Sequence, residues 1–353
     1  MSKATTRPTL TLEHTAMSEA EALKFLEGHR ITRDDRTMEP KAQIVGEFVK
    51  SIRVPGSFPP LPELRQQLRT MVQLLDEPAP TIARVENITI PGPVGAIPGR
   101  VYDAAGVGAP ARPVVAYFHG DGWVQGDLET HHGLCARLAL RSGAIVVAID
   151  YRLAPEHQFP AAVEDCCAAY RWLRSHTAEV GGNAGRIAVA GDSAGGNLSA
   201  VVSLLSASEG MQVPTCQVLL YPALDFALDT PLHRELVDGH IIPRDRIVWY
   251  MQQYLPAGAD INDPRASPLR APELNGQPPT LIITAGFDPL RDDGYAYAER
   301  LRAASVDVVY HEYRGQIHAF VSLTKAIPQG MDCTWEIGDY LKEQFRASGS
   351  GSC

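Results

Sequence analysis

A serine between two glycines, with a strand pattern before it and a helix pattern after it, constrains this chain most. Ser193 lies in the pentapeptide Gly191-Asp192-Ser193-Ala194-Gly195. The β-rich run 186–190 precedes it, and the helix-compatible run 196–202 follows it. A turn this tight needs small neighbours and presents the serine hydroxyl at the positive end of the helix. The segment therefore predicts a reactive serine at a strand-to-helix turn, with an ordinary glycine-rich turn as the alternative.

The rest of the chain alternates strand and helix patterns from about Glu86 onward, which is the signature of a mostly parallel sheet covered by helices. An antiparallel pair is expected to open the sheet, followed by a series of buried strands. The expected strands are 85–90, 99–103, 114–118, 144–149, 186–190, 216–221, 280–285 and 306–310, and helices are expected near 130–141, 161–175 and 335–345. The sequence thus predicts an α/β fold with eight strands and one core.

Two regions depart from this alternation. Residues 1–80 are helix-prone and interrupted by prolines, and residues 225–268 separate two core strands by more than a usual connection. We expect both to form a helical cap over a catalytic domain made of residues 81–224 and 269–346. Three aromatic residues of this cap are expected to face the pocket or, alternatively, to form the cap's own core: Trp249, Tyr250 and Tyr254. Residues 347–353 are expected to be a flexible tail.

Composition argues against several classes of function. The 353 residues are 45% hydrophobic and carry a net charge of −9, which disfavours nucleic acid or an anionic membrane as the main partner. No stretch is apolar for the roughly 18 residues of a membrane span, and the N-terminus has no secretion signal. The six cysteines lack CxxC spacing and suggest reduced thiols. A soluble, cytoplasmic protein is expected.

A serine hydroxyl is a poor nucleophile unless a base removes its proton and a carboxylate orients that base. Asp288 and His318 both follow predicted strands, and they occur in the order serine, acid, histidine. The neighbouring Asp292 and Asp293 begin the next helix, where the helix dipole favours negative charge. Asp288 is therefore the expected acid and His318 the expected base.

The other histidines fit structural roles better. His311 lies within a strand, and His131 and His132 lie near the start of a helix. None shows the spacing of a metal site such as HExxH, so no metal or other cofactor is predicted.

Several ordered motifs accompany these three residues. They are the loop His119-Gly120-Asp121-Gly122-Trp123, the stretch Tyr151-Arg152-Leu153-Ala154-Pro155-Glu156-His157, the Gly-Asp-Ser-Ala-Gly-Gly elbow, Asp288-Pro289-Leu290-Arg291-Asp292 and Ile317-His318-Ala319-Phe320. Together they resemble the bacterial hormone-sensitive-lipase group of the α/β-hydrolases, over residues 40 to 345 approximately. The resemblance implies an α/β-hydrolase fold and a capped esterase for short to medium acyl esters, without a cofactor and often dimeric through the last edge of the sheet.

The resemblance also assigns roles residue by residue. It names Ser193, Asp288 and His318 as a catalytic triad. The backbone N–H groups of Asp121, Gly122 and Ala194 become the donors of an oxyanion hole, and His119 and Gly120 support their loop. Trp123, next to these donors, is expected to form a wall of the pocket or, alternatively, to pack the loop.

Asp121 departs from the family pattern, which has glycine at this position. Its N–H is retained, but aspartate adopts a positive φ less freely than glycine. A carboxylate about 5 Å from an oxyanion, at an effective dielectric of about 20, raises its energy by roughly 3 kcal/mol, or about a hundredfold in rate. The side chain can point away, pair with a cation, take up a proton or position a water or a cationic leaving group.

The sequence therefore predicts a serine carboxylesterase that forms an acyl-enzyme from a small-molecule ester. An amidase or a lactonase with the same triad is the first alternative. A ligand-binding relative impaired by Asp121 is the second, and this residue is its only support.

Overall fold

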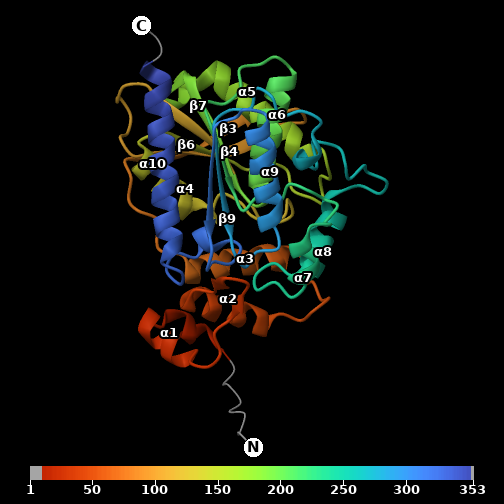
Figure 1. The fold of residues 1–353 in the computed structure, drawn as a ribbon. Helices are drawn as coiled ribbons and strands as arrows, with labels where there is room; N and C mark the ends of the chain where they lie inside the picture. Colours follow the sequence, from red (N-terminus) through yellow and green to blue (C-terminus); the bar gives the residue numbers. More distant parts are fainter. Residues whose placement is uncertain (1–9, 351–353) are drawn as a thin grey trace, which may run out of the picture.

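The computed structural model describes residues 10–350 and has an eight-stranded sheet at its centre (Figure 1). The strands lie in the order β10-β9-β8-β7-β5-β6-β4-β3, and neighbours are parallel except where β4 pairs with β3 and β6. Their bounds are β3 Arg84–Pro91, β4 Ala96–Asp103, β5 Arg112–Phe118, β6 Ile145–Ile149, β7 Gly182–Asp192, β8 Gln217–Leu220, β9 Thr280–Ala285 and β10 Val308–Tyr313. The expected eight-stranded, mostly parallel sheet of an α/β fold is confirmed.

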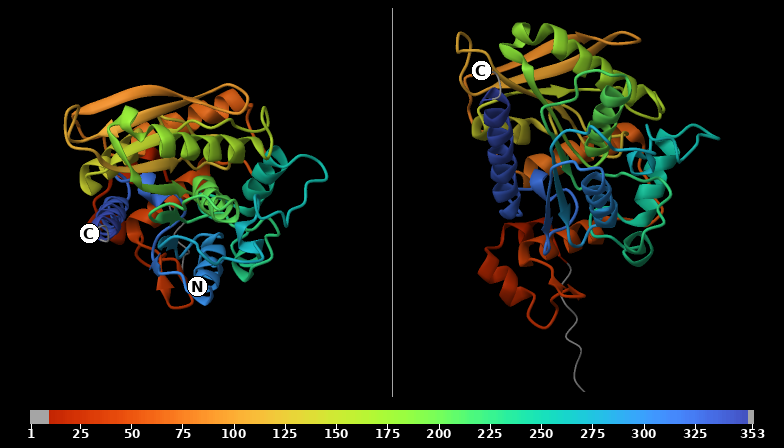
Figure 2. Two further views of the ribbon diagram at one scale, coloured as in Figure 1. Left: turned by 90° about the horizontal axis from the view of Figure 1, so that it is seen from above. Right: turned by 45° about the horizontal axis from the view of Figure 1, so that its top comes forward.

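Helices cover both faces of this sheet (Figure 2). On one face lie α4 (His132–Ser142) and α10 (Gln329–Ser350), and on the other lie α5 (Ala161–His176), α6 (Ala194–Ser208) and α9 (Arg291–Ala303). The central strands β6 and β9 are buried at every position, since they are covered from both sides. Short 3-10 helices lie at Leu12–Ala16, Thr177–Val180, Pro268–Arg270 and Phe320–Ser322.

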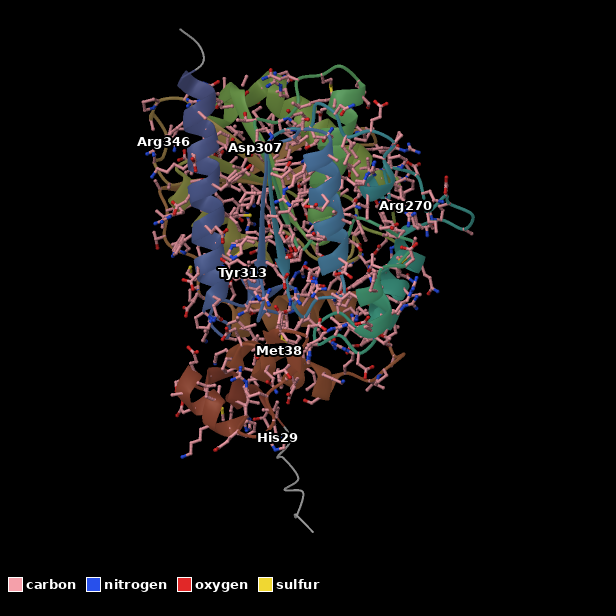
Figure 3. The ribbon with its side chains drawn as sticks, viewed as in Figure 1. His29, Met38, Arg270, Asp307, Tyr313 and Arg346 are labelled. Atoms are coloured by element: carbon pink, nitrogen blue, oxygen red, sulfur yellow. The ribbon has the colours of Figure 1, made fainter. Side chains whose placement is uncertain are left out.

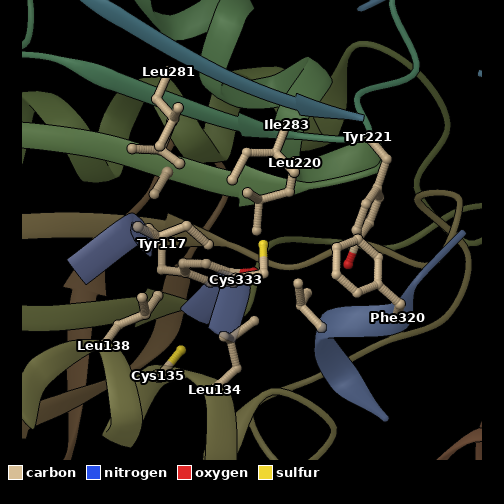
Figure 4. Close-up of a cluster of buried hydrophobic side chains, with 14 of the residues drawn as sticks. Tyr117, Leu134, Cys135, Leu138, Leu220, Tyr221, Leu281, Ile283, Phe320 and Cys333 are labelled. Carbon is tan, nitrogen blue, oxygen red and sulfur yellow. The ribbon is translucent and has the colours of Figure 1, made fainter. Parts of the chain in front are cut away.

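The core on the α4 and α10 side reaches the end of the sheet where Ser193 lies. Leu134 and Leu138 of α4 and Cys333 of α10 pack against Leu220 and Ile283 of β8 and β9 (Figure 4). The five described cysteines are free and buried, whereas Cys353 lies outside the described residues. None of the helices within residues 10–350 combines the length and the apolar character that a bilayer crossing requires.

The two regions outside the alternation lie at the carboxyl ends of the parallel strands. The first contains α1 (Glu19–Phe25), α2 (Pro40–Ile52), α3 (Leu61–Leu75) and a ribbon of β1 (Thr32–Arg33) and β2 (Arg36–Thr37); the second contains α7 (Pro231–Glu235) and α8 (Arg244–Tyr254). Figure 3 shows Tyr313, which ends β10, toward Met38 and the N-terminal helices, and Asp307 at the opposite end. The Glu39 amide donates to the Gly315 carbonyl at 2.8 Å, so the N-terminal region contacts the loop that leads to His318.

Two details differ from the sequence expectations. The small ribbon of β1 and β2 was not expected in a region that is otherwise helical. The last helix extends to Ser350, so the chain from residue 347 to 350 is helical rather than a flexible tail, and residues 351–353 lie outside the described part. The residues of α10 that pack in the core end at Phe345, and the helix continues beyond them into the segment rich in glycine and serine.

Candidate active site

Ser193 occupies a strained turn between β7 and α6. Its backbone has φ 52° and ψ −113°, a conformation that costs a residue with a side chain on the order of 1–3 kcal/mol. The flanking glycines are required by close contacts: a Cβ on Gly195 would lie 1.8 Å from the Phe118 carbonyl oxygen, and one on Gly191 would lie 2.4 Å from the Gly195 carbonyl carbon. The small residues therefore allow β5, β7 and α6 to meet at this turn.

Three loops bring the predicted triad side chains together. The Nε2 atom of His318 lies 3.0 Å from the Ser193 Oγ, and its Nδ1 atom lies 2.6 Å from an oxygen of Asp288. Asp288 is fully buried, and its other oxygen accepts a hydrogen bond from the Leu290 amide at 2.9 Å. This arrangement fixes the imidazole so that its Nε2 is available to the serine hydroxyl.

The environment of His318 favours its protonated form. Burial disfavours the charged ring, but the carboxylate of Asp288, with smaller effects from Asp192 and Asp121, raises the pKa of His318 above the ordinary value. An imidazole with these neighbours is a stronger base toward the serine proton than a solvated one. The competing acids Asp292 and Asp293 do begin α9, as predicted, and neither contacts His318 through a hydrogen bond.

The loop after β5 turns sharply beside Ser193. Asp121, Gly122 and Trp123 all have positive φ values, of 73°, 68° and 61°. Within the described residues, the N–H groups of Asp121, Gly122 and Ala194 donate to no other protein group. A Cβ on Gly122 would lie 2.4 Å from the Tyr250 ring. The loop thus has free donors next to the serine and no space for a side chain at residue 122.

His119 and Gly120 hold the start of this loop. The His119 ring stacks on Tyr151 with ring centres 4.3 Å apart, its Nδ1 lies 3.0 Å from the Gly120 carbonyl oxygen, and the Tyr151 hydroxyl donates to the His119 carbonyl at 2.7 Å. Burial, with a smaller effect of His131, lowers the pKa of His119 to about 4. A neutral imidazole that donates from Nδ1 is consistent with these contacts. A Cβ on Gly120 would lie 2.3 Å from a carboxylate oxygen of Asp192.

A buried pair of charges lies behind the loop. The Nε2 atom of His131 is 3.1 Å from one carboxylate oxygen of Asp192 and 3.3 Å from the other, and the Tyr117 hydroxyl donates to the same group at 2.7 Å. Burial opposes protonation of His131, but Asp192 outweighs it and the pKa rises to about 9. The sequence predicted a structural role for His131 near the start of a helix. Its proximity to the site depends on the tertiary contact between the residue that precedes α4 and Asp192 at the end of β7.

Ser193 borders two cavities of different size. The smaller, of about 30 Å³, is apolar, and among its lining residues are Trp123, Ile247, Tyr250 and Met251. The larger, of about 350 Å³, extends between α2, α3 and the sheet and also contains His318 and Asp121. Both cavities are also lined by Gly122, Ile242 and Tyr250.

The predicted pocket aromatics divide into two groups. Trp123 and Tyr250 line a cavity, whereas Trp249 and Tyr254 line neither, which corrects that expectation. Tyr254 is fully buried and stacks behind Trp123, with ring centres 4.5 Å apart. Trp249 stacks on Phe58 of the loop between α2 and α3 at 4.6 Å. Adjacent positions on a helix point about 100° apart, so Trp249 cannot share the direction of Tyr250.

Two residues that sequence reasoning missed connect the N-terminal region to the site. Arg65 of α3 donates to the Val124 carbonyl at 2.9 Å and pairs with Glu156 at 2.8 Å. Gln125 donates to the Leu64 carbonyl at 2.8 Å and accepts from the Tyr250 hydroxyl at 2.7 Å. These bonds join α3, the loop after β5 and α8. No local sequence pattern signals them, because the partners come from distant segments.

Comparison with known proteins gives the family of this chain. A family described as having the alpha/beta hydrolase fold matches residues 115–322. The carboxylic ester hydrolase LipN of Mycobacterium tuberculosis is 42% identical over 306 residues, which are 84% of this chain and 80% of the relative. An ethyl acetate hydrolase of Pseudomonas putida is 37% identical over 220 residues, 62% of this chain and 69% of the relative.

A solved structure of an ester hydrolase is also similar to this chain. An ester hydrolase from the metagenome of Lake Arreo, complexed with a bipyridine phosphonate derivative, superposes with a TM-score of 0.83 at 36% identity, over 87% of this chain and 99% of that one. Fold, site and comparisons define an α/β-hydrolase, and the chain belongs to this family. Within it, the chain belongs to the hormone-sensitive-lipase-like group, as its motifs predicted.

Proposed function

We propose that this protein is a serine carboxylesterase that hydrolyses short to medium acyl esters through an acyl-enzyme intermediate. Ser193 is the nucleophile, His318 is the general base and acid, and Asp288 orients the imidazole and stabilises its cation. The 3.0 Å contact between His318 Nε2 and Ser193 Oγ is the observation that carries the proposal. The names of the relatives, which describe ester hydrolases, support the reaction class.

The reaction proceeds in two halves. His318 accepts the Ser193 proton as the oxygen attacks the ester carbonyl, and the N–H groups of Asp121, Gly122 and Ala194 stabilise the oxyanion. His318 then donates the proton to the leaving alcohol, and the acyl group remains on the serine. A water molecule, activated by the same imidazole, hydrolyses this ester and regenerates Ser193.

The two cavities fit the two parts of the substrate. The leaving oxygen has to approach His318 to receive its proton, and His318 lines only the larger cavity. The alcohol portion therefore occupies the larger cavity and the acyl portion the smaller one. Because the smaller cavity is narrow and apolar, acyl groups at the short end of the expected range fit best.

Residues 1–80 and 225–268 are proposed to form the cap over this site. Within the described residues, α2, α3 and the segment before α8 supply much of the larger cavity, including Leu64, Met71 and Ile241. The bonds of Arg65 and Gln125 support a fixed position of this cap. Dimer formation through the edge strand β10 remains a prediction from the family resemblance.

Ester hydrolysis can be tested with p-nitrophenyl acetate and butyrate. Wild-type protein should release nitrophenol, and Ser193→Ala should lower kcat on the order of 10⁶-fold. Equal, slow release by both proteins would refute the proposal and favour a ligand-binding protein. The rate on a phenyl ester compared with the matched anilide separates an esterase from an amidase, and a lactone supplies the third comparison.

A further inference from the structure

Asp121 places a carboxylate in the cavity where the leaving alcohol binds. It lines the larger cavity together with Ser193 and His318, but it does not line the smaller one. Its side chain is half-buried, and it makes no hydrogen bond to another described residue. Asp121 thus lines the same cavity as the reacting groups, on the proposed side of the alcohol.

The surrounding charges do not neutralise Asp121. Among the positive groups, His131 has the largest effect on Asp121, ahead of His318, but this imidazole is already paired with Asp192 at 3.1 Å. The pair is neutral as a whole, which leaves the charge of Asp121 unbalanced. No arginine or lysine in the described part of the chain lies within ion-pairing distance of Asp121.

The two arginines that line the same cavity are engaged elsewhere. Arg53 donates to the carbonyl oxygens of Gly239, His240 and Ile241. The Arg246 guanidinium lies over the Phe58 ring, 5.2 Å from its centre. Both guanidinium groups keep their positive charge, and in the described part of the chain neither forms an ion pair with Asp121.

The pKa of Asp121 lies below neutral pH, which favours the carboxylate. Burial raises its pKa to about 6; the positive charge of His131 opposes the increase and Asp192 adds to it. In the transition state the carboxylate repels the oxyanion and attracts the imidazolium of His318, so these effects oppose one another for a neutral substrate. When the alcohol portion carries a positive charge, the carboxylate also attracts that charge, and no second effect opposes this attraction.

We infer that Asp121 makes this site selective for esters whose alcohol portion carries a positive charge, such as esters of amino alcohols or quaternary ammonium alcohols. The inference rests on the proposed ester hydrolysis and on the unpartnered carboxylate in the cavity of the leaving group. The cation is recognised by its charge.

The test compares two esters that differ in charge alone. Acetylcholine and 3,3-dimethylbutyl acetate have the same acyl group and nearly the same shape. Wild-type protein should show at least about tenfold higher kcat/KM for the cationic ester, as expected for a partly buried charge contact. Asp121→Asn should bring this ratio close to one, and Asp121→Gly, which restores the family residue, should do the same.

Asp245→Asn is the matched control. It removes an equal charge from an exposed position at the start of α8, where Asp245 accepts a hydrogen bond from the Gly56 amide, and it should keep the wild-type ratio. A wild-type ratio of one, or a ratio unchanged in Asp121→Asn, would overturn the inference. Activity on p-nitrophenyl acetate that depends on Ser193 distinguishes this outcome from failure of the proposed function.

Discussion

The imidazole of His318 lies 3.0 Å from the hydroxyl oxygen of Ser193, although 125 residues separate them in the chain. Both follow the carboxyl ends of parallel strands in one sheet, since β7 precedes the serine turn and β10 precedes the histidine loop, with β8 and β9 between these two strands. The proposed ester hydrolysis depends on this contact and on the charged groups around it.

Replacement of Asp288 by asparagine should lower kcat for p-nitrophenyl acetate by about 10⁴-fold, because the amide no longer fixes the imidazole tautomer or stabilises its cation. Asp292→Asn is the control, as Asp292 begins α9 and pairs with Arg291 rather than with His318. If the two variants lose activity equally, Asp288 does not have the proposed role.

The pH dependence of kcat/KM should report the proton on His318. The free base is the active form, so activity should fall as the pH decreases through the pKa of His318, which its neighbours hold above the ordinary value. Asp121 contributes to that increase, so Asp121→Asn should move the acid limb to lower pH. The titratable groups that act electrostatically on Asp121 are His131, Asp192, His318 and Asp127.

A pH series with p-nitrophenyl acetate for wild type, Asp121→Asn and Asp245→Asn measures this shift. The Asp245 variant should retain the wild-type limb. An acid limb that stays in place, or moves to higher pH, in Asp121→Asn would show that the two groups do not interact as described.

Substitution of Gly122 by alanine should lower kcat by about 10²- to 10³-fold, the typical effect of losing one oxyanion donor. The new Cβ would lie 2.4 Å from the Tyr250 ring, so the loop and its N–H have to move. Gly210→Ala is a matched control, because Gly210 has a similar φ of 66° but open space around it. Gly210→Ala should lower the free energy of unfolding by on the order of 1 kcal/mol and leave kcat unchanged. If both variants lose the same factor in kcat, backbone strain rather than loss of an oxyanion donor explains the effect.

Truncation of Met251 should widen the acyl specificity. Met251 lines the smaller cavity only, and space for one or two methylenes, at about 0.8 kcal/mol each, corresponds to a four- to fifteenfold change. Met251→Ala should therefore increase kcat/KM for p-nitrophenyl octanoate relative to acetate by about this factor. Gln252→Ala, exposed on the same helix, should keep the original ratio. A preference for acetate that is unchanged in Met251→Ala would place the acyl chain elsewhere.

Local patterns were sufficient to predict much of the fold. The strand 280–285 was predicted at its observed bounds, and the antiparallel pair that opens the sheet was predicted and corresponds to β3 and β4. The serine turn was also predictable from the sequence, because a serine with glycines on both sides, between a strand and a helix, is typical of a tight strand-to-helix turn. Such features depend on residues close together in the chain.

The sequence by itself determined the parallel sheet, the strained turn at Ser193 and the order of the three proposed catalytic residues, because hydrophobic periodicity and backbone sterics act over short distances. Only the tertiary structure decided that Tyr250 rather than Trp249 faces a cavity, that Arg65 joins α3 to Glu156, and that His131 pairs with Asp192 and leaves Asp121 without a partner. Such relations depend on how distant segments pack, since the free energy of a buried charge is set by the groups that surround it in space.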